Sequence, residues 1–309
     1  MSANLAPAPP LPPAQHAPAK LLLFGEHTVL HGSTAYALPL PLFSAELDLA
    51  GGAESAGQPF TGWLAYVAQR PALAAALELE RWRAEAPRLR LVSDIPQGYG
   101  LGSSGALTAL VYRRYGRPAA GRYREVLAGL EGYFHGRSSG LDPLVSYLGA
   151  PVVVERDGSV SLPEEASPTP PALHPGGRWF LLDSGRQRAG GEAVARFGES
   201  CRDETWARTV LRPMIGLVDD LVEGVARGLA GGLAPKLRAL SAHQLEHLGF
   251  LIPRNVAAHW RRGLGDDTFW CKLCGAGGGG YFLGYAPEPT AVDAAGAELL
   301  WLGSPTSAS

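Results

Sequence analysis

The sequence predicts a chain that mixes strands with helices and divides into two domains. Short apolar runs bounded by Gly and Pro alternate with longer stretches that place apolar residues at positions i, i+3 and i+4. The chain has 309 residues, which is more than a single domain usually holds. A Pro-, Ser- and Glu-rich stretch over residues 160–177 is the best candidate for the domain boundary.

Composition narrows the class of protein. A hydrophobic content of 46% indicates a globular chain with a sizeable core, and a net charge of -2 argues against nucleic acid or an anionic membrane as the main partner. No window approaches the ~18 apolar residues that span a bilayer. Three cysteines, an odd number, favour a reducing cytoplasm over a disulfide framework, and the Cys271–Cys274 CxxC lacks a second pair at zinc-finger spacing.

In the first half, strands and helices are expected in alternation. Residues 1–19 predict a flexible Pro/Ala-rich arm without the features of a secretory signal, and residues 304–309 a flexible tail. A buried strand starts at Lys20 and breaks at Gly25. The expected elements that follow are strands over 35–43 and 44–50, where Pro39 and Pro41 suggest an edge or a bulge, helices over 60–70 and 71–85, and a strand over 88–96.

Helices dominate the remainder. The predicted elements are helices over 103–116 and 121–134, a short helix near Asp142, strands over 151–155 and 178–185, and helices over 211–232, 234–250 and 253–265. Near the end, a second glycine run over 274–280 leads into an apolar strand. Because a linker rarely leads directly into a buried strand, this run predicts a structural role or the close approach of a ligand.

The stretch from Ile95 to Leu110 is typical of an anion site. Gly98, Gly100 and Gly102 alternate, and Ser103 and Ser104 then open a helical pattern. Glycines let backbone N–H groups approach a ligand, and the helix adds unsatisfied donors and the positive end of its dipole. A phosphate chain is the natural ligand, although a surface turn remains an alternative.

Two other nucleotide motifs fit this stretch less well. The run GLGSSG over 100–105 matches the dinucleotide fingerprint GxGxxG, but the residues around Glu125 predict a second helix where that fold needs a strand. The ATP P-loop requires a Lys after the glycines, and none is present.

Further residues complete the requirements of phosphoryl transfer. Ser104 and Glu131 offer oxygen ligands for Mg²⁺, Asp142 can act on an attacking hydroxyl, and Lys20 can offset the developing charge. Each has a structural alternative. Glu131 can be a solvated helix residue, Asp142 a helix N-cap before Pro143, and Lys20 a strand-edge charge. His27 and His135 can likewise be hydrogen-bonded structural residues.

Four motifs in order resemble those of the GHMP small-molecule kinases, and the resemblance covers residues 20 to 285. They are KLLLFGEHTVLHG from Lys20, PQGYGLGSSGA from Pro96, EGYFHGRSSGLD from Glu131 and KLCGAGGGG from Lys272. Within the family they are most similar to the enzymes that phosphorylate mevalonate. The resemblance implies an α+β, two-domain GHMP kinase architecture. A ribosomal-protein-S5-like α/β domain would cover 20–165 and a ferredoxin-like α+β domain 175–303, with ATP in the cleft between them.

The resemblance also implies roles for individual residues. Asp142 would be the catalytic base, paired with Lys20, which lowers the pKa of the substrate hydroxyl. Ser104 and Glu131 would bind Mg²⁺. The residues expected to wrap the ATP triphosphate are Pro96, Gly98, Gly100, Leu101, Gly102, Ser103 and Ser104. Those expected to face the acceptor substrate are Glu26, His27 and Gly277. A homodimer is the oligomeric state that the family suggests.

Departures from the family pattern concern the acceptor side. Arg137 and Ser138 stand where Asn and Pro are usual, Cys274 where Thr is usual, and RQRAGG over 186–191 lacks a Thr common near that strand. The leading hypothesis is an ATP- and Mg²⁺-dependent kinase of mevalonate, in isoprenoid precursor synthesis. The alternatives are a kinase of another small alcohol, such as a sugar or homoserine, a non-catalytic nucleotide-binding regulator and, less favoured, a decarboxylase.

Overall fold

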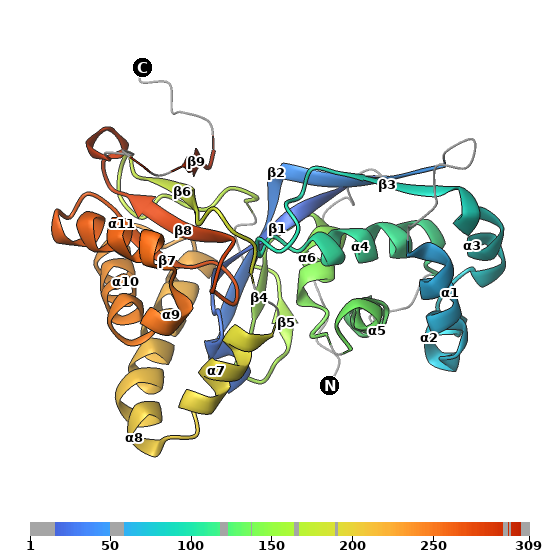
Figure 1. Cartoon of the computed structure of the whole chain (residues 1–309), viewed down its shortest axis with the longest axis horizontal. Coiled ribbons are helices and arrows are strands. Elements are labelled where there is room, and N and C mark those ends of the chain that lie inside the picture. Colours follow the sequence, from blue (N-terminus) through green and yellow to red (C-terminus); the bar gives the residue numbers. More distant parts are fainter. Residues whose placement is uncertain are drawn as a thin grey trace. The chain divides into compact units, whose positions relative to one another are not determined.

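The computed structural model describes residues 16–49, 59–117, 123–136, 138–163, 167–188, 191–292, 296 and 298–303. It confirms a mixed α+β fold with two sheets, whose elements Figure 1 labels. Two compact units divide the chain. The first unit consists of the described residues within 1–20, 39–96 and 101–150. The second unit consists of the described residues within 21–38, 97–100 and 151–309. None of the described helices is long and apolar enough to cross a membrane.

The first unit packs helices beside a strand pair. The second half of β2 (Ala35–Leu49) pairs antiparallel with β3 (Leu89–Ser93), in a register that sets Ala45 opposite Ser93. Its helices are α1 (Phe60–Ala68), α2 (Pro71–Ala75), α3 (Leu79–Glu85), a 3-10 turn (Ala86–Arg88), α4 (Ser103–Tyr115), α5 (Tyr123–His135) and α6 (Leu141–Leu148). Helix α4 packs against both α5 and α6 and is buried along almost its whole length.

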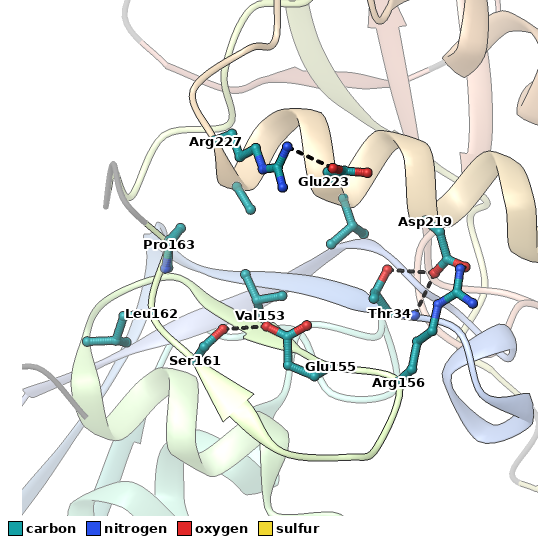
Figure 2. A pocket seen from close by; sticks show the side chains of 12 residues that line it. Thr34, Val153, Glu155, Arg156, Ser161, Leu162, Pro163, Asp219, Glu223 and Arg227 are labelled. Carbon is teal, nitrogen blue, oxygen red and sulfur yellow. Dashed lines mark hydrogen bonds and ion pairs between the residues drawn. The ribbon is translucent and has the colours of Figure 1, made fainter. Parts of the chain in front are cut away.

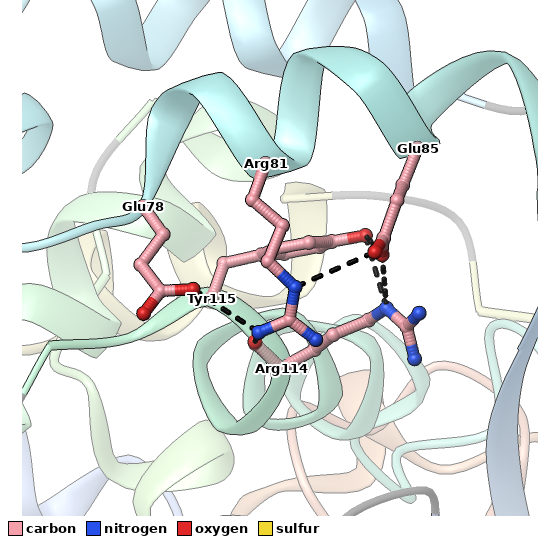
Figure 3. A network of polar contacts seen from close by, with 5 residues as sticks. All are labelled: Glu78, Arg81, Glu85, Arg114 and Tyr115. Carbon is pink, nitrogen blue, oxygen red and sulfur yellow. Dashed lines mark hydrogen bonds and ion pairs between the residues drawn. The ribbon is translucent and has the colours of Figure 1, made fainter.

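A polar network anchors α3 to the end of α4 (Figure 3). The Glu85 carboxylate accepts hydrogen bonds from Arg114 Nε at 2.7 Å and from the Tyr115 hydroxyl at 2.8 Å. Arg81 Nη1 donates to the Arg114 carbonyl at 3.0 Å. The network lies at the C-terminal end of α4. The N-terminal end of that helix, which follows the glycine loop, takes no part in it.

Two strand predictions need correction. The runs over 35–43 and 44–50 form the single strand β2, and Pro39 and Pro41 lie between its stretch paired to β4 and its stretch paired to β3. Strand β1 (His16–Phe24) starts before Lys20, so residues 16–19 are strand rather than arm. Residues 1–15 and 304–309 lie outside the described residues.

The second unit contains a four-stranded antiparallel sheet in the order β7-β8-β6-β9. The strands of this sheet are β6 (Arg178–Asp183), β7 (Trp270–Leu273), β8 (Tyr281–Ala286) and β9 (Leu299–Trp301). The same unit also holds β4 (Val152–Val154) and β5 (Val160–Ser161), which belong to the other sheet. The first half of β2 pairs with β4, and β4 pairs with β5. Strands β6 and β8 carry the core side chains Phe180 and Phe282, both fully buried.

The main helices of the second unit lie between β6 and β7 along the chain. They are α7 (Glu192–Ser200), α8 (Glu204–Trp206), a π-helical turn (Ala207–Leu211), α9 (Arg212–Ala226), α10 (Ala234–His247) and α11 (Arg254–Gly265). Short 3-10 turns span Thr28–His31, Gly249–Leu251 and Pro289–Ala291. Helices α10 and α11 pack against β7, so the strand that leads into the second glycine run is buried.

Candidate active site

The first unit holds the helix start that the glycine loop predicts. Gly102, with φ 73° and ψ 39°, directly precedes α4, and Ser103 is its first residue. The Lys20 backbone N–H donates to the Leu101 carbonyl at 2.9 Å. A Cβ on Gly102 would lie 2.7 Å from Lys20 Cγ. The glycine is therefore needed both for its left-handed backbone and for the close approach of the lysine side chain.

Lys20 and Asp142 form an ion pair in this unit. Lys20 Nζ lies 3.0 Å from Asp142 Oδ1, and the side chains are 6% and 36% exposed. Asp142 is the second residue of α6, whose N-cap is Gly140 with no side-chain cap. The N-cap alternative for Asp142 is therefore wrong, and the burial of Lys20 rules out an ordinary strand-edge charge. The carboxylate is held by one ammonium and still reaches the surface.

Glu131 is buried beside these residues and is held by two hydroxyl groups. Ser104 Oγ donates to its Oε1 at 3.1 Å, and Ser138 Oγ donates to its Oε2. Only 4% of Glu131 is exposed, so the solvated-residue alternative is wrong. Burial and then the charge of Asp142 raise the pKa of Glu131 to about 7, although both hydroxyl hydrogen bonds lower it. A cation beside this carboxylate would offset the cost of its burial.

His135 extends this cluster. Its Nε2 lies 2.9 Å from Ser104 Oγ. Because the single hydroxyl hydrogen of Ser104 points to Glu131, the imidazole Nε2 is the donor in this contact. Arg137, the neighbouring departure from the family pattern, lies outside the described residues.

His27 occupies a strained turn in the second unit. Its φ of 61° and ψ of -46° are unusual for a residue other than glycine. The Thr28 N–H donates to the Glu26 carbonyl at 2.7 Å, which closes a γ-turn of the rare positive-φ type around His27. Such a conformation costs about 1–3 kcal/mol and persists only where the surroundings fix it. Strain of this kind is concentrated at functional sites.

The His27 ring is held in one chemical form. Its Nε2 lies 3.0 Å from the Ala276 carbonyl, and the ring stacks on Phe197 with centroids 4.4 Å apart. Burial lowers the pKa of His27 to about 4, the Ala276 hydrogen bond opposes this shift, and the nearby His31 adds to it. The imidazole is therefore neutral near pH 7. Since a carbonyl only accepts, Nε2 carries the hydrogen and Nδ1 is left as a hydrogen-bond acceptor.

Glu26 pairs with a lysine that the motif analysis did not single out. Lys272 Nζ donates to Glu26 Oε1 and, at 2.5 Å, to the Leu273 carbonyl. The side chains are 0% and 1% exposed. The expectation that Glu26 faces the acceptor stays a prediction, because the structure directs this carboxylate oxygen to Lys272. The scarcity of lysine, only Lys20, Lys236 and Lys272 in the chain, was the sequence signal that could have found it.

The first part of the glycine loop lies against the second glycine run within this unit. Arg188 N–H donates to the Gly98 carbonyl at 3.0 Å, and a Cβ on Gly100 would lie 2.7 Å from the Cys274 carbonyl. A Cβ on Gly275 would lie 3.0 Å from Arg188 Nη1. Gly277, expected near the acceptor, packs on Leu251. Arg188 is a second residue that the motif analysis missed, and its guanidinium lies where both glycine runs meet.

A pocket between the β4–β5 hairpin and α9 (Figure 2) contains none of the predicted residues, and its charges are already paired. Arg156 pairs with Asp219 at 2.7 Å, and Arg227 with Glu223 at 2.9 Å. Among the described residues, no group of three or more His, Cys, Asp or Glu side chains could hold a metal. Cys271 and Cys274 are buried and form no disulfide, and burial raises the pKa of the Cys271 thiol, which disfavours its reactive thiolate form.

Comparison with known proteins finds a family match over part of the chain. Residues 66–150 match the model of the GHMP kinases N terminal domain. This part of the chain is therefore similar to the GHMP kinases, whose members are ATP-dependent phosphotransferases that act on small alcohols. No protein of curated function matches the chain by sequence.

Solved structures share the fold at low identity. Mevalonate kinase of L. major in complex with R-mevalonate is 16% identical, with a TM-score of 0.58 and 100% of each chain covered. Lactococcus lactis galactokinase with galactose is 14% identical, with a TM-score of 0.62 over 93% of this chain and 92% of that one. Streptococcus pneumoniae phosphomevalonate kinase is 15% identical, with a TM-score of 0.59 over 93% and 98%. The expected resemblance and fold are confirmed, and these likenesses leave the acceptor open.

Proposed function

We propose that this protein is an ATP-dependent kinase that transfers the γ-phosphate to the hydroxyl of mevalonate. The observation that carries the proposal is the ion pair between Lys20 of β1 and Asp142 of α6, beside the start of α4. A buried ammonium holds a partly exposed carboxylate 3.0 Å away, next to the glycine that opens the helix. A nucleotide-binding regulator would need the loop and the helix, but it would not need this pair.

The chemistry follows from these residues. Asp142 would accept the proton of the acceptor hydroxyl while that oxygen forms a bond to the γ-phosphorus and the bond between the γ-phosphorus and the bridging oxygen of ADP breaks. The Lys20 ammonium would stabilise the negative charge that develops on the attacking oxygen. The N–H groups at the start of α4 and those of the glycine loop bind the phosphate oxygens. Within the second unit, the Arg188 guanidinium beside Gly275 is a positive group that can bind a phosphate.

Mg²⁺ fits the donors that the first unit offers. Ser104 Oγ and the Glu131 carboxylate supply two adjacent oxygen ligands, and Mg²⁺ typically takes one or two protein ligands together with waters and phosphates. When bound, the ion would neutralise charge on the transferred phosphoryl group. Glu131 would hold the ion, while Ser138 and Ser104 orient the Glu131 carboxylate.

His27 is the residue proposed to recognise the acceptor. Its Nδ1 is an acceptor in the neutral tautomer, so it can receive a hydrogen bond from a hydroxyl of the substrate. Mevalonate is favoured because the GEHTVLHG and EGYFHG motifs resemble those of the enzymes that phosphorylate it. Another small alcohol is the second candidate, because the buried Cys274 stands where the family pattern has Thr.

Phosphorus NMR of the products tests both candidates. The protein is incubated with ATP, Mg²⁺ and each acceptor of a panel comprising mevalonate, phosphomevalonate, galactose and homoserine. We expect ADP and a new phosphomonoester signal with mevalonate, and none with Asp142→Asn. A phosphorylated product only with another acceptor would replace mevalonate by that acceptor. ATP binding without turnover on any acceptor would favour the regulator. Homodimer formation and a cytoplasmic location remain predictions from the sequence.

A further inference from the structure

The γ-turn at His27 needs contacts from outside the turn. The turn is closed by the hydrogen bond from the Thr28 N–H to the Glu26 carbonyl, and His27 lacks the freedom of a glycine. Two contacts hold the His27 ring itself, the Ala276 carbonyl and the face of Phe197. The backbone is also held locally, because the Val29 N–H donates to the Gly25 carbonyl and the Leu30 N–H to the His27 carbonyl, both at 3.1 Å. All of these backbone bonds lie within the same short segment, so an anchor from a distant strand adds a constraint that they do not supply.

Lys272 provides that anchor from β7. Its Nζ is bonded to the Glu26 carboxylate, in the residue immediately before His27, and lies 5.9 Å from the centroid of the Phe24 ring. This distance is within the range of a cation–π interaction. The Lys272 ammonium therefore contacts the residues on both sides of Gly25, at the point where the chain leaves β1. The Leu273 N–H donates to Gln244 at 2.9 Å, which fixes the strand end that carries Lys272.

A buried ion pair is a costly way to hold a fold together. Well-packed apolar residues of similar volume are often as stabilising as such a pair or more so, because both charges lose their hydration. What an ion pair adds is a defined position for its two groups. Lys272 also stands three residues before Gly275, so it ties the γ-turn to the strand that continues into the second glycine run.

We propose that Lys272 is a positioning residue for acceptor binding: by holding Glu26 it maintains the γ-turn that presents the neutral His27 ring. Glu26 then acts through Lys272 and the turn rather than by touching the acceptor. The proposal rests on the proposed function for its kinetic consequence, but its structural consequence, the fixed state of the His27 ring, is measurable without turnover.

The test removes both charges together, so that neither is left buried alone. The variant K272M/E26Q is compared with the wild type in ligand-free, ¹⁵N-histidine-labelled protein, and the His27 signals among the eight histidines are assigned with His27→Gln. The matched control is K236M/D220N, which removes an exposed Lys–Asp pair with a 2.7 Å contact in the same unit. Ring ¹⁵N shifts, thermal stability and the KM values for ATP and the acceptor are measured for each.

We expect the wild type and the control to show His27 as a single Nε2–H tautomer. The folded K272M/E26Q variant should lose that signature, and its acceptor KM should rise about tenfold while the ATP KM stays within about twofold. A folded variant with wild-type ring shifts and acceptor KM would overturn the proposal. If the wild type turns over no acceptor, the proposed function fails and the ring shifts alone decide the positioning role.

A second double variant guards against misfolding of the first. K272Q/E26Q keeps a neutral amide pair in the same place, which can still form a hydrogen bond across it. We expect ring shifts and an acceptor KM between those of the wild type and K272M/E26Q. Failure of both double variants to fold would overturn the proposal, because the pair would then be an element of folding.

Discussion

Lys20 Nζ lies 3.0 Å from Asp142 Oδ1, an ion pair that joins strand β1 to the first turn of α6. The two ends of this pair differ in exposure: the lysine side chain is 6% exposed and the carboxylate 36%. The buried partner fixes the position, and the exposed partner keeps a free side for another molecule. Such a division suits a base that must meet a substrate hydroxyl at a defined place.

Asp142→Asn should remove the chemical step while leaving ATP binding almost unchanged. The amide keeps the shape of the side chain but cannot accept the hydroxyl proton, so we expect kcat to fall by about 10²–10⁴-fold. The dissociation constant of ATP should stay within about threefold, as measured by calorimetry. Asp220→Asn, which changes a carboxylate paired with Lys236 on the surface, is the control. Turnover by Asp142→Asn near the wild-type rate would contradict its role as the base.

Ser138 gives this chain a hydrogen bond that the proline usual in the family cannot make. Its hydroxyl donates to Glu131 Oε2 and accepts from the Gly140 N–H at 2.9 Å. Ser138→Ala should weaken the hold of Glu131 on a divalent ion, because residues that orient a metal ligand typically contribute 10–100-fold in metal affinity.

Binding of Mn²⁺ to the ATP complex, followed by electron paramagnetic resonance, measures this effect. The expected change for Ser138→Ala is about tenfold in the Mn²⁺ dissociation constant. Ser139→Ala is the neighbouring control, since the Ser139 hydroxyl only accepts from the Leu141 N–H at 3.3 Å. Equal Mn²⁺ affinities in the two variants would show that Ser138 does not act through Glu131.

Gly105 sets the distance between α4 and α6. A Cβ at this position would lie 2.9 Å from the Asp142 carbonyl carbon and 2.9 Å from Pro143 N, and backbone atoms cannot move aside easily. Gly105→Ala should therefore lower the free energy of unfolding by about 1–3 kcal/mol, the usual cost of overpacking. The control is Gly198→Ala on α7, where no neighbouring atom lies within 4 Å of the new methyl group. Because alanine favours a helix more than glycine does, this variant should raise the free energy of unfolding by about 0.5–1 kcal/mol. Denaturant titration distinguishes the two, and equal effects would exclude close helix packing as the cause.

The local pattern of the sequence predicted the elements well where no distant segment intervenes. The glycine loop followed by α4 was read from spacing alone, and it was found at the predicted residues. The predicted helix over 71–85 is instead divided into α2 and α3. Leu77 forms a β-bridge with Gly116, and the Glu78 N–H donates to the Tyr115 carbonyl at 2.7 Å. These partners lie far along the chain, so helical periodicity could not reveal the break.

The candidate site was predictable only in part for the same reason. The residue types alone indicated Lys20, Glu131 and Asp142 as candidates, but each also had a structural explanation. The burial of these side chains and the distances between them in the structure excluded those explanations. Lys272 lies in an apolar strand 246 residues from Glu26, and its pairing has no local signature. Ser138 was noticed as a departure from the family pattern, and only the structure connects its hydroxyl to Glu131.

The stability of the ligand-free protein should depend on pH through His27. Burial lowers the pKa of this imidazole from 6.5 to about 4. Between these values the unfolded chain binds a proton that the folded protein does not bind, so acidification favours unfolding. The contribution of His27 is fully present above pH 6.5 and is lost as pH falls toward 4. Over that range it amounts to about 3 kcal/mol of unfolding free energy.

His27→Gln isolates this contribution from the titration of the carboxylates. The variant should lose less unfolding free energy than the wild type between pH 6.5 and 4, by about 3 kcal/mol, in denaturant titrations at several pH values. His259→Gln, which changes a histidine whose Nε2 contacts the Gly296 carbonyl at 3.2 Å, is the control for the loss of a histidine elsewhere in the unit. Parallel curves for the wild type and His27→Gln would mean that the pKa of His27 is the same in the folded and the unfolded chain, so that the imidazole protonates near pH 6.5. A protonated imidazole carries a hydrogen on Nδ1 as well, so the binding of a substrate hydroxyl by His27 would then be lost as pH falls through 6.5.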